Sequence, residues 1–249
     1  MTDSRSHVIE LNAIEFSWKA GIPVLDIPEL TVFRGEKVFV RGPSGSGKTT
    51  LLGLLGGVIT AERGQVKVLE NDISRFSPVQ RDLFRADHIG FIFQMFNLIP
   101  YLSVIENVTL PLSFAKQRKS NLASMADSEQ DEARRLLRHL ELDESLLHRP
   151  VTELSIGQQQ RVAAARALIG KPDLIIADEP TSALDTDTRE AFINLLFAEC
   201  EAAGNTLLFV SHDQSLESLF DRSIVLNEIN RASQPPSPAS PTSKAIEVD

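Results

Sequence analysis

The sequence predicts an α/β fold with a parallel sheet at its core, an N-terminal antiparallel β-subdomain and an inserted α-helical subdomain. Runs that are apolar on both faces, LIIA ending at Asp178 and LLFV before Ser211, alternate with helical segments, as central parallel strands do. The segment from Val8 to Phe16 reads as strand material with alternating polarity. Residues from about Met95 to Gly170 are mostly helical in pattern and interrupt the strands.

Composition restricts the classes of protein that are possible. The chain has 249 residues, 42% apolar and 24% charged, values that exclude a fully disordered or fibrous chain. The net charge of −9 argues against a nucleic-acid partner, because neutralising phosphates requires surplus Lys and Arg. Cys200 is the only cysteine, which fits a reducing compartment, and its helical surroundings favour a buried packing role.

No signal-peptide pattern or membrane-spanning segment is recognisable. Residues 1–10 lack an apolar core, and no run approaches the roughly 18 apolar residues that a membrane helix needs. We therefore expect a cytoplasmic protein that reaches the membrane only through a partner.

The elements before the helical segment follow in order. Residues 24–41 continue the extended pattern with Gly35 as a turn, and a glycine-rich loop then opens a helix at 49–55. Residues 64–72 and 88–93 are expected to form a further strand pair.

Within the helical segment, the polar stretch 116–127 is expected to be flexible. Ser128 and Asp131 resemble a capping box, after which apolar residues recur at helical spacing at Ala133, Leu136, Leu137 and Leu140. We expect one domain over residues 1–230, with its helical subdomain at about 95–170. Residues 231–249 form a Pro- and Ser-rich tail that is expected to be disordered.

The glycine-rich loop matches the phosphate-binding pattern G-x-x-x-x-G-K-[ST] and lies between a strand and a helix, as its mechanism demands. The loop consists of Gly42, Pro43, Ser44, Gly45, Ser46, Gly47, Lys48 and Thr49. Glycines let backbone N–H groups turn around a phosphate chain, and the helix N-terminus adds positive potential. Lys48 is expected to reach the β- and γ-phosphates, Thr49 to bind Mg²⁺, and Thr50 to line the pocket.

Polar residues follow the buried apolar runs. Asp178 is placed to hold Mg²⁺ and Glu179 to polarise an attacking water, while Ser211, His212 and Gln94 follow other strands. Read singly, the acidic pair could instead cap a helix, and the His and Gln could be ordinary surface residues. Convergence on the carboxyl edge of one sheet, beside the phosphate loop, favours a nucleotide site.

The segment LSIGQQQRVAAARALIG, residues 154–170, begins with Ser155 as a potential cap of an Ala-rich helix. Its N-terminus is a second potential anion site, remote from the phosphate loop. This separation suggests that two copies meet head to tail, each completing the other's nucleotide site. Simple helix capping is the alternative.

Together these motifs resemble the ATP-binding-cassette ATPases, over residues from about Val8 to Val225. The resemblance implies a P-loop NTPase fold with a RecA-like core, and ATP and Mg²⁺ as cofactors. It makes Glu179 the catalytic base, assisted by Lys48 and by His212 at the γ-phosphate. Gln94 then joins Thr49 and Asp178 at Mg²⁺ and links the metal to the transport partner.

The same resemblance assigns the remaining binding residues. Trp18 stacks on adenine, with Phe16 as second choice, and residues 182–185 form the D-loop. The family signature contacts ATP in trans across a homodimer. In this chain its contacting residues are Ser155, Gly157 and Gln158.

One position departs from the family pattern, because Ile156 stands where the signature usually has glycine. If this position required a positive φ, a β-branched residue would cost on the order of 1–2 kcal/mol. If it is an ordinary helix start, Ile is tolerated. We expect that Ile156 is tolerated at this position.

Residues 90–112 resemble the lipoprotein-releasing and macrolide-exporter type of cassette. That likeness implies an integral-membrane permease with few membrane helices and a large extracytoplasmic region, docking near Met95 to Asn107 at the inner face of the membrane. Phe96, Leu98, Ile99 and Leu102 could instead be core.

The leading functional hypothesis is therefore the ATP-hydrolysing subunit of a membrane transporter. The alternative is a mechanotransmitting ATPase that regulates an envelope enzyme or sensor. A soluble cassette of DNA repair or translation ranks below both, because the chain has a single cassette and no sustained heptads.

Overall fold

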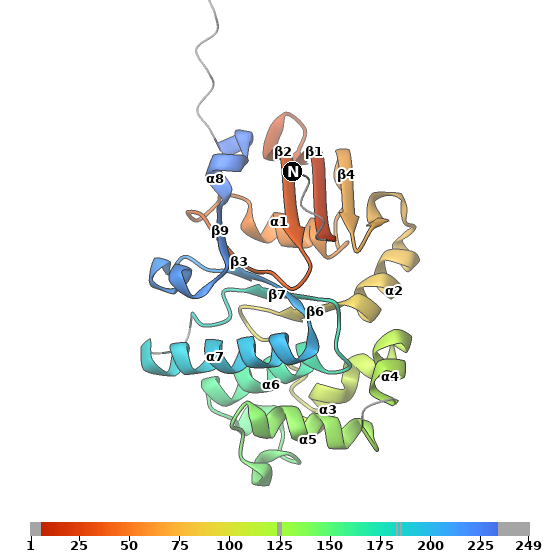
Figure 1. Cartoon of the computed structure of the whole chain (residues 1–249), viewed down its shortest axis with the longest axis vertical. Coiled ribbons are helices and arrows are strands. Elements are labelled where there is room, and N and C mark those ends of the chain that lie inside the picture. Colours follow the sequence, from red (N-terminus) through yellow and green to blue (C-terminus); the bar gives the residue numbers. More distant parts are fainter. Residues whose placement is uncertain (1–5, 124–125, 183, 185, 234–249) are drawn as a thin grey trace, which may run out of the picture.

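The computed structural model describes residues 6–123, 126–182, 184 and 186–233. Its strands form a four-stranded sheet in the order β2-β1-β4-β5 and a five-stranded sheet in the order β6-β7-β8-β3-β9. In Figure 1 the first sheet lies at the top, most of the larger helices lie at the bottom, and the second sheet lies between them. The predicted α/β fold class is confirmed.

The first sheet is antiparallel and carries the N-terminal part of the chain. Its strands are β1 (His7–Lys19), β2 (Ile22–Phe33), β4 (Arg63–Val68) and β5 (Asn71–Asp72). The β1 strand pairs with β2 on one side and with β4 on the other, and each pairing is antiparallel.

The second sheet is parallel throughout its pairings. Its strands are β3 (Lys37–Arg41), β6 (Ile89–Ile92), β7 (Leu174–Asp178), β8 (Thr206–Val210) and β9 (Arg222–Val225). Both faces are buried: Ile175 and Ala177 point into one apolar cluster, and Leu174 and Ile176 into another. This double burial explains the uninterrupted apolar runs.

The α-helices are α1 (Lys48–Leu55), α2 (Pro78–His88), α3 (Val104–Thr109), α4 (Lys116–Ala123), α5 (Glu129–His139), α6 (Ile156–Leu168), α7 (Thr186–Ala203) and α8 (Leu226–Ile229). Short 3₁₀ helices are η1 (Ile73–Arg75), η2 (Leu110–Ser113), η3 (Glu144–Leu146), η4 (Val151–Glu153), η5 (Gln214–Leu219) and η6 (Arg231–Ser233). No helix within the described ranges is both long and apolar enough to cross a bilayer.

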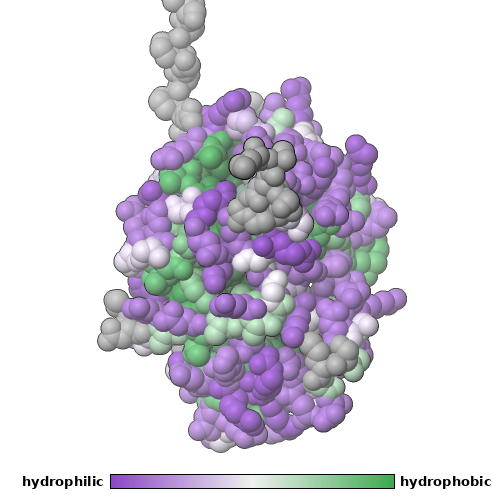
Figure 2. All heavy atoms as spheres, viewed as in Figure 1, coloured by the Kyte–Doolittle hydropathy of each residue, from purple (hydrophilic) through white to green (hydrophobic). Residues whose placement is uncertain are grey.

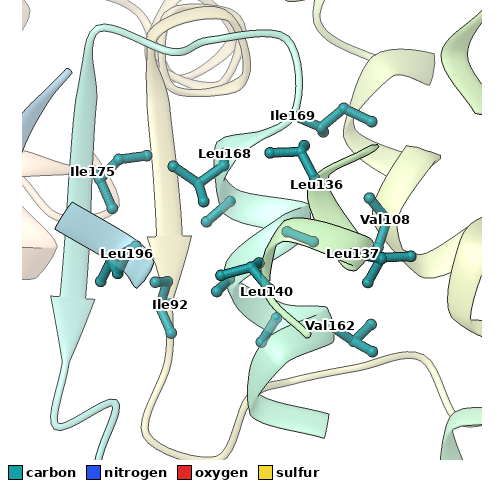
Figure 3. Close-up of a cluster of buried hydrophobic side chains, with 14 of the residues drawn as sticks. Ile92, Val108, Leu136, Leu137, Leu140, Val162, Leu168, Ile169, Ile175 and Leu196 are labelled. Carbon is teal, nitrogen blue, oxygen red and sulfur yellow. The ribbon is translucent and has the colours of Figure 1, made fainter. Parts of the chain in front are cut away.

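One apolar cluster joins the parallel sheet to the helices of the inserted segment. Figure 3 shows Ile92 and Ile175 of the sheet facing Leu168 of α6 and Leu196 of α7, and Leu137 of α5 beside Val108 of α3 on the other side of the cluster. The other cluster packs α1 and the antiparallel sheet against the opposite face of the parallel sheet. The surface seen in Figure 2 is mostly hydrophilic, and hydrophobic side chains gather there only in small patches.

Two sequence-based expectations differ from the structure. Residues 64–72 and 88–93 do not pair with each other, because β4 and β5 belong to the antiparallel sheet and β6 to the parallel one. The polar stretch 116–127 contains helix α4, whose Arg118 is 2% exposed. The Arg118 guanidinium donates to the carbonyls of Arg166, Ala167 and Ile169 at the end of α6, which anchors the helix.

The first three residues of the tail expected at 231–249 are part of the fold. Residues 231–233 form η6, which contacts β2, and Ala232 donates its N–H to the side chain of Asn230. Residues 234–249 lie outside the described residues.

An ion-pair cluster joins α5 to α7. Arg135 donates at 3.0 Å to both carboxylate oxygens of Glu199 and at 2.8 Å to Glu132, and His139 also contacts Glu199. Glu199 is 3% exposed. Burial raises the pKa of Glu199, but the hydrogen bonds from Arg135 and His139 outweigh it, so the pKa lies below its usual value.

We predict that Glu199→Gln lowers the free energy of unfolding at neutral pH by about 1–3 kcal/mol, because Arg135 loses a buried carboxylate partner. Because the pKa of Glu199 is lower in the folded than in the unfolded protein, its carboxylate stabilises the fold at pH values above the unfolded-state pKa of about 4.3. This contribution is lost as the pH falls through the folded-state pKa. The difference between variant and parent should therefore shrink in acid. Urea unfolding across pH measures it, with Glu201→Gln on the exposed face of α7 as control. Equal effects of the two changes would contradict the prediction.

Candidate functional site

The phosphate loop connects β3 to α1. Gly45 and Gly47 have φ values of 81° and 97°, in the left-handed region that favours glycine. The Lys48 Nζ donates to the carbonyl oxygens of Gly42, at 2.7 Å, and of Pro43, at 3.1 Å. The loop therefore wraps around its own lysine at the start of α1.

Two glycines of the phosphate loop, Gly42 and Gly47, are also required because neighbouring atoms leave no room for a Cβ. A Cβ on Gly47 would lie 2.7 Å from Leu25 Cδ2, and a Cβ on Gly42 would lie 2.6 Å from Ser46 Oγ. Within the described residues, the N–H groups of Ser44, Gly45 and Gly47 have no protein acceptor. Such free N–H groups at a helix N-terminus form a nest for an anion.

A cavity of about 490 Å³ lies at the carboxyl ends of the parallel strands. It is lined by Val24, Ser44, Gly45, Gly47, Lys48, Thr49, Thr50, Gln94, Asp178, Glu179 and His212. The phosphate loop, the acidic pair, the histidine and the glutamine thus meet at one place, although they lie far apart in the sequence. Val24 is a lining residue that no sequence pattern indicated.

Asp178 ends β7 beside the start of α1. Burial raises its pKa, and the adjacent Glu179 carboxylate raises it further, while Lys48 and a hydrogen bond with Thr49 act in the opposite direction. The Thr49 hydroxyl, the Asp178 carboxylate and the Gln94 amide are hard oxygen donors around one cavity, and Mg²⁺ prefers such ligands together with water and phosphate oxygens. The residues present fit a magnesium ion.

Glu179 is held in an unusual conformation. Its φ is 46° and it is 9% exposed. Its Oε2 lies 2.9 Å from His212 Nδ1 and accepts a hydrogen bond from Ser211 Oγ at 3.3 Å. Strained backbone of this kind gathers at functional sites. Because the next helix, α7, begins only at Thr186, the acidic pair does not cap it.

Trp18 lies beside the phosphate loop but does not line the cavity. It is 63% exposed, its Nε1 donates to Thr50 Oγ1 at 3.3 Å, and its ring stands edge-on to Phe16 at 5.0 Å. Phe16 is buried, which leaves Trp18 as the accessible aromatic face at this end of the site.

The signature segment starts α6, away from the cavity of its own chain. The Ser155 hydroxyl accepts from the Gln158 N–H, and the Gln158 side chain accepts from the Ser155 N–H. Ile156 is the first helical residue, has no positive φ and is 56% exposed. Of the predicted D-loop, residues 183 and 185 lie outside the described residues.

The segment expected to contact a permease is divided between surface and core. Met95 and Tyr101 are 81% and 83% exposed, whereas Phe96 is buried. Asn107 is also buried, and its side chain bonds to the backbone of Ile99. Part of the apolar set therefore belongs to the core.

Comparison with known proteins agrees with this geometry. A family model described as "ABC transporter" matches residues 25–182. The lipoprotein-releasing system ATP-binding protein LolD of Cytophaga hutchinsonii is 39% identical over 207 residues, covering 83% of this chain and 91% of LolD. The macrolide export ATP-binding/permease protein MacB of Rhodopirellula baltica is 37% identical over 224 residues, covering 89% of this chain and 32% of MacB.

A solved structure is also similar. The dimeric post-hydrolysis state of the ATP-binding cassette MJ0796, bound to ADP and Pi, is 35% identical with a TM-score of 0.78, covering 90% of this chain and 95% of that one. These matches confirm the family resemblance inferred from the motifs. The chain belongs to the ABC transporter family, as an ATP-binding and ATP-hydrolysing subunit.

Proposed function

We propose that the chain powers an integral-membrane permease of the lipoprotein-releasing or macrolide-exporting type, at the inner face of the membrane. The observation that carries this proposal is the convergence of Lys48, Asp178, Glu179 and His212 on one cavity at the end of a parallel sheet. The similarity to LolD and MacB over most of the chain supports the choice of branch.

In this proposal the phosphate loop holds the triphosphate through its inward N–H groups and Lys48. Thr49, Asp178 and Gln94 hold Mg²⁺, which neutralises charge on the phosphate oxygens when bound. Trp18 contacts adenine next to Thr50.

Glu179 orients the attacking water, and His212 keeps the Glu179 carboxylate in position through their 2.9 Å contact. The Ser211 hydroxyl fixes the same oxygen, so the rotamer of Glu179 is restricted from two sides. His212 also lines the cavity, where its side chain can contact the γ-phosphate.

A second copy completes the site in trans, as the dimeric state of MJ0796 supports. The N-terminus of α6, with Ser155, Gly157 and Gln158, faces the γ-phosphate of the partner's nucleotide. ATP then favours the closed dimer because it contacts both subunits only there, and hydrolysis removes that preference.

We predict that Glu179→Gln retains ATP binding but lowers ATP turnover at least about a hundredfold, because the amide cannot accept the proton of the attacking water. The variant should accumulate as an ATP-dependent dimer on gel filtration. Steady-state turnover and nucleotide titration measure the two effects, with Glu201→Gln as control. Unchanged turnover would remove Glu179 from this role.

We predict that Ile156→Gly changes turnover by less than about threefold, since the position has ordinary helical geometry and no positive φ to relieve. Turnover of the two forms at saturating ATP tests this. A gain of about tenfold or more would mean that Ile156 handicaps the native signature.

The proposed docking site for the permease is an apolar groove of about 540 Å³ between the parallel sheet, α2 and α4. Its lining includes the exposed or partly exposed apolar side chains of Val58, Leu83, Phe93 and Phe114. From the expected docking segment 95–107, only Asn97 lines this groove.

The charged residues that line the groove indicate which kind of partner would bind there. Arg118 and Arg166 both line it and donate to backbone carbonyls, and Arg85 and Asp82, which also line it, form an ion pair with each other. Burial lowers the pKa of Arg118 to about 10 and also lowers that of Arg166. The lining thus carries three arginines against the single carboxylate of Asp82, so a permease helix with an apolar face and an acidic side chain would complement its charge.

We predict that Leu83→Glu releases most of the chain from native membranes, because it places a carboxylate in the apolar groove. Val79→Glu is the matched control: Val79 lies one turn earlier on α2 and is 67% exposed, but does not line the groove. Fractionation of cells into membrane and supernatant measures the effect, and ATP turnover of the purified variants checks that both are folded. Equal membrane association of the two variants would contradict docking in this groove.

A further inference from the structure

Asn230 is a buried polar residue at the end of α8, far from the catalytic motifs in sequence. It is 0% exposed. Its Oδ1 accepts from the N–H groups of Asp26, at 2.8 Å, and Ala232, at 3.2 Å. Its Nδ2 donates to the carbonyls of Val24, at 2.9 Å, and Ser46, at 3.2 Å. One side chain thus joins β2, the phosphate loop and the C-terminal segment.

The bond to Ser46 determines the orientation of a peptide plane in the phosphate loop. The carbonyl of Ser46 and the N–H of Gly47 belong to one planar trans peptide, so they point in opposite directions. Holding the carbonyl toward Asn230 therefore directs the Gly47 N–H to the other side of the loop. Gly47 lines the nucleotide cavity, and its N–H has no protein acceptor within the described residues.

The bond to Val24 fixes the loop against the antiparallel sheet. The Val24 carbonyl oxygen lies 3.2 Å from where a Gly47 Cβ would be, and Val24 itself lines the cavity. The same Nδ2 of Asn230 contacts both carbonyls, so a movement of the loop away from β2 breaks at least one of these bonds.

We propose that Asn230 is a positioning residue for nucleotide binding, which aims the Gly47 N–H at the phosphate chain and holds the phosphate loop against β2. The proposal rests on the proposed function only in taking the cavity as the nucleotide site. Asn230 does not touch the nucleotide, and it acts through Ser46 and Gly47.

The test compares Asn230→Asp and Asn230→Ala with a matched control. The Asp variant keeps the acceptor oxygen Oδ1 but replaces the donor Nδ2 with a second oxygen, which repels the carbonyls of Val24 and Ser46. The Ala variant removes both the donor and the acceptor without adding charge. The control is Asn205→Asp: Asn205 is 4% exposed, donates to the Pro172 carbonyl and precedes β8 at the end of the sheet opposite the cavity.

Both Asn230 variants should lose about tenfold or more in affinity for ATP and for inorganic tripolyphosphate, which probes the phosphate loop alone. Asn205→Asp should lower the melting temperature comparably but leave both affinities within about twofold. In ¹⁵N-labelled protein, the Gly47 amide resonance should shift downfield on adding tripolyphosphate, and shift much less in the Asn230 variants.

Asn230 variants that bind both ligands as the parent does would overturn the inference, and so would an equal loss of affinity in the Asn205 control. If Asn230→Asp does not fold, Asn230→Ala and the amide shift decide the question. Failure of the parent protein to bind ATP or tripolyphosphate would instead overturn the proposed function, so the two failures are distinguishable.

Discussion

The phosphate loop can bind an anion only if its N–H groups stay turned inward, and the surrounding elements meet that requirement. The left-handed φ values of Gly45 and Gly47 turn the backbone, and contacts from Leu25 and Ser46 leave no room for side chains at Gly47 and Gly42. The β3 strand belongs to the parallel sheet and α1 packs between this sheet and the antiparallel one, so the loop between β3 and α1 is held at both ends. Its geometry is therefore fixed before a ligand arrives, which lowers the entropy cost of binding.

The parallel sheet brings the remaining chemistry to this loop. Asp178 and Glu179 follow β7, and His212 follows β8 closely, so their side chains reach the same edge as Lys48. The left-handed backbone of Glu179 and its contacts with Ser211 and His212 hold the carboxylate at the cavity. Two strand ends thus determine the place and the rotamer of one side chain.

Much of the fold and of the candidate site could be predicted from patterns that are local in the sequence. The loop motif, the apolar strands and the Ser155 cap are each set by neighbouring residues, and the structure shows the loop, β7, β8 and the start of α6 where they were expected. Helix α4 was not predictable, because its stability comes from Arg118 contacting carbonyls about fifty residues away. Val24 and Asn230 could not be predicted as site residues for the same reason. Their positions at the site depend on long-range packing, which leaves no periodic pattern in the sequence.

Helix α6 has a consequence for how the two ends of the molecule communicate. Its 13 residues span about 20 Å without interruption, with Ser155 capping one end and Arg166 in the last turn. Arg118 donates hydrogen bonds to the carbonyls at the C-terminal end of α6, so this end of the helix does not fray where it borders the groove. A stiff lever of this length converts a small tilt at the groove into a larger sideways displacement of the opposite tip.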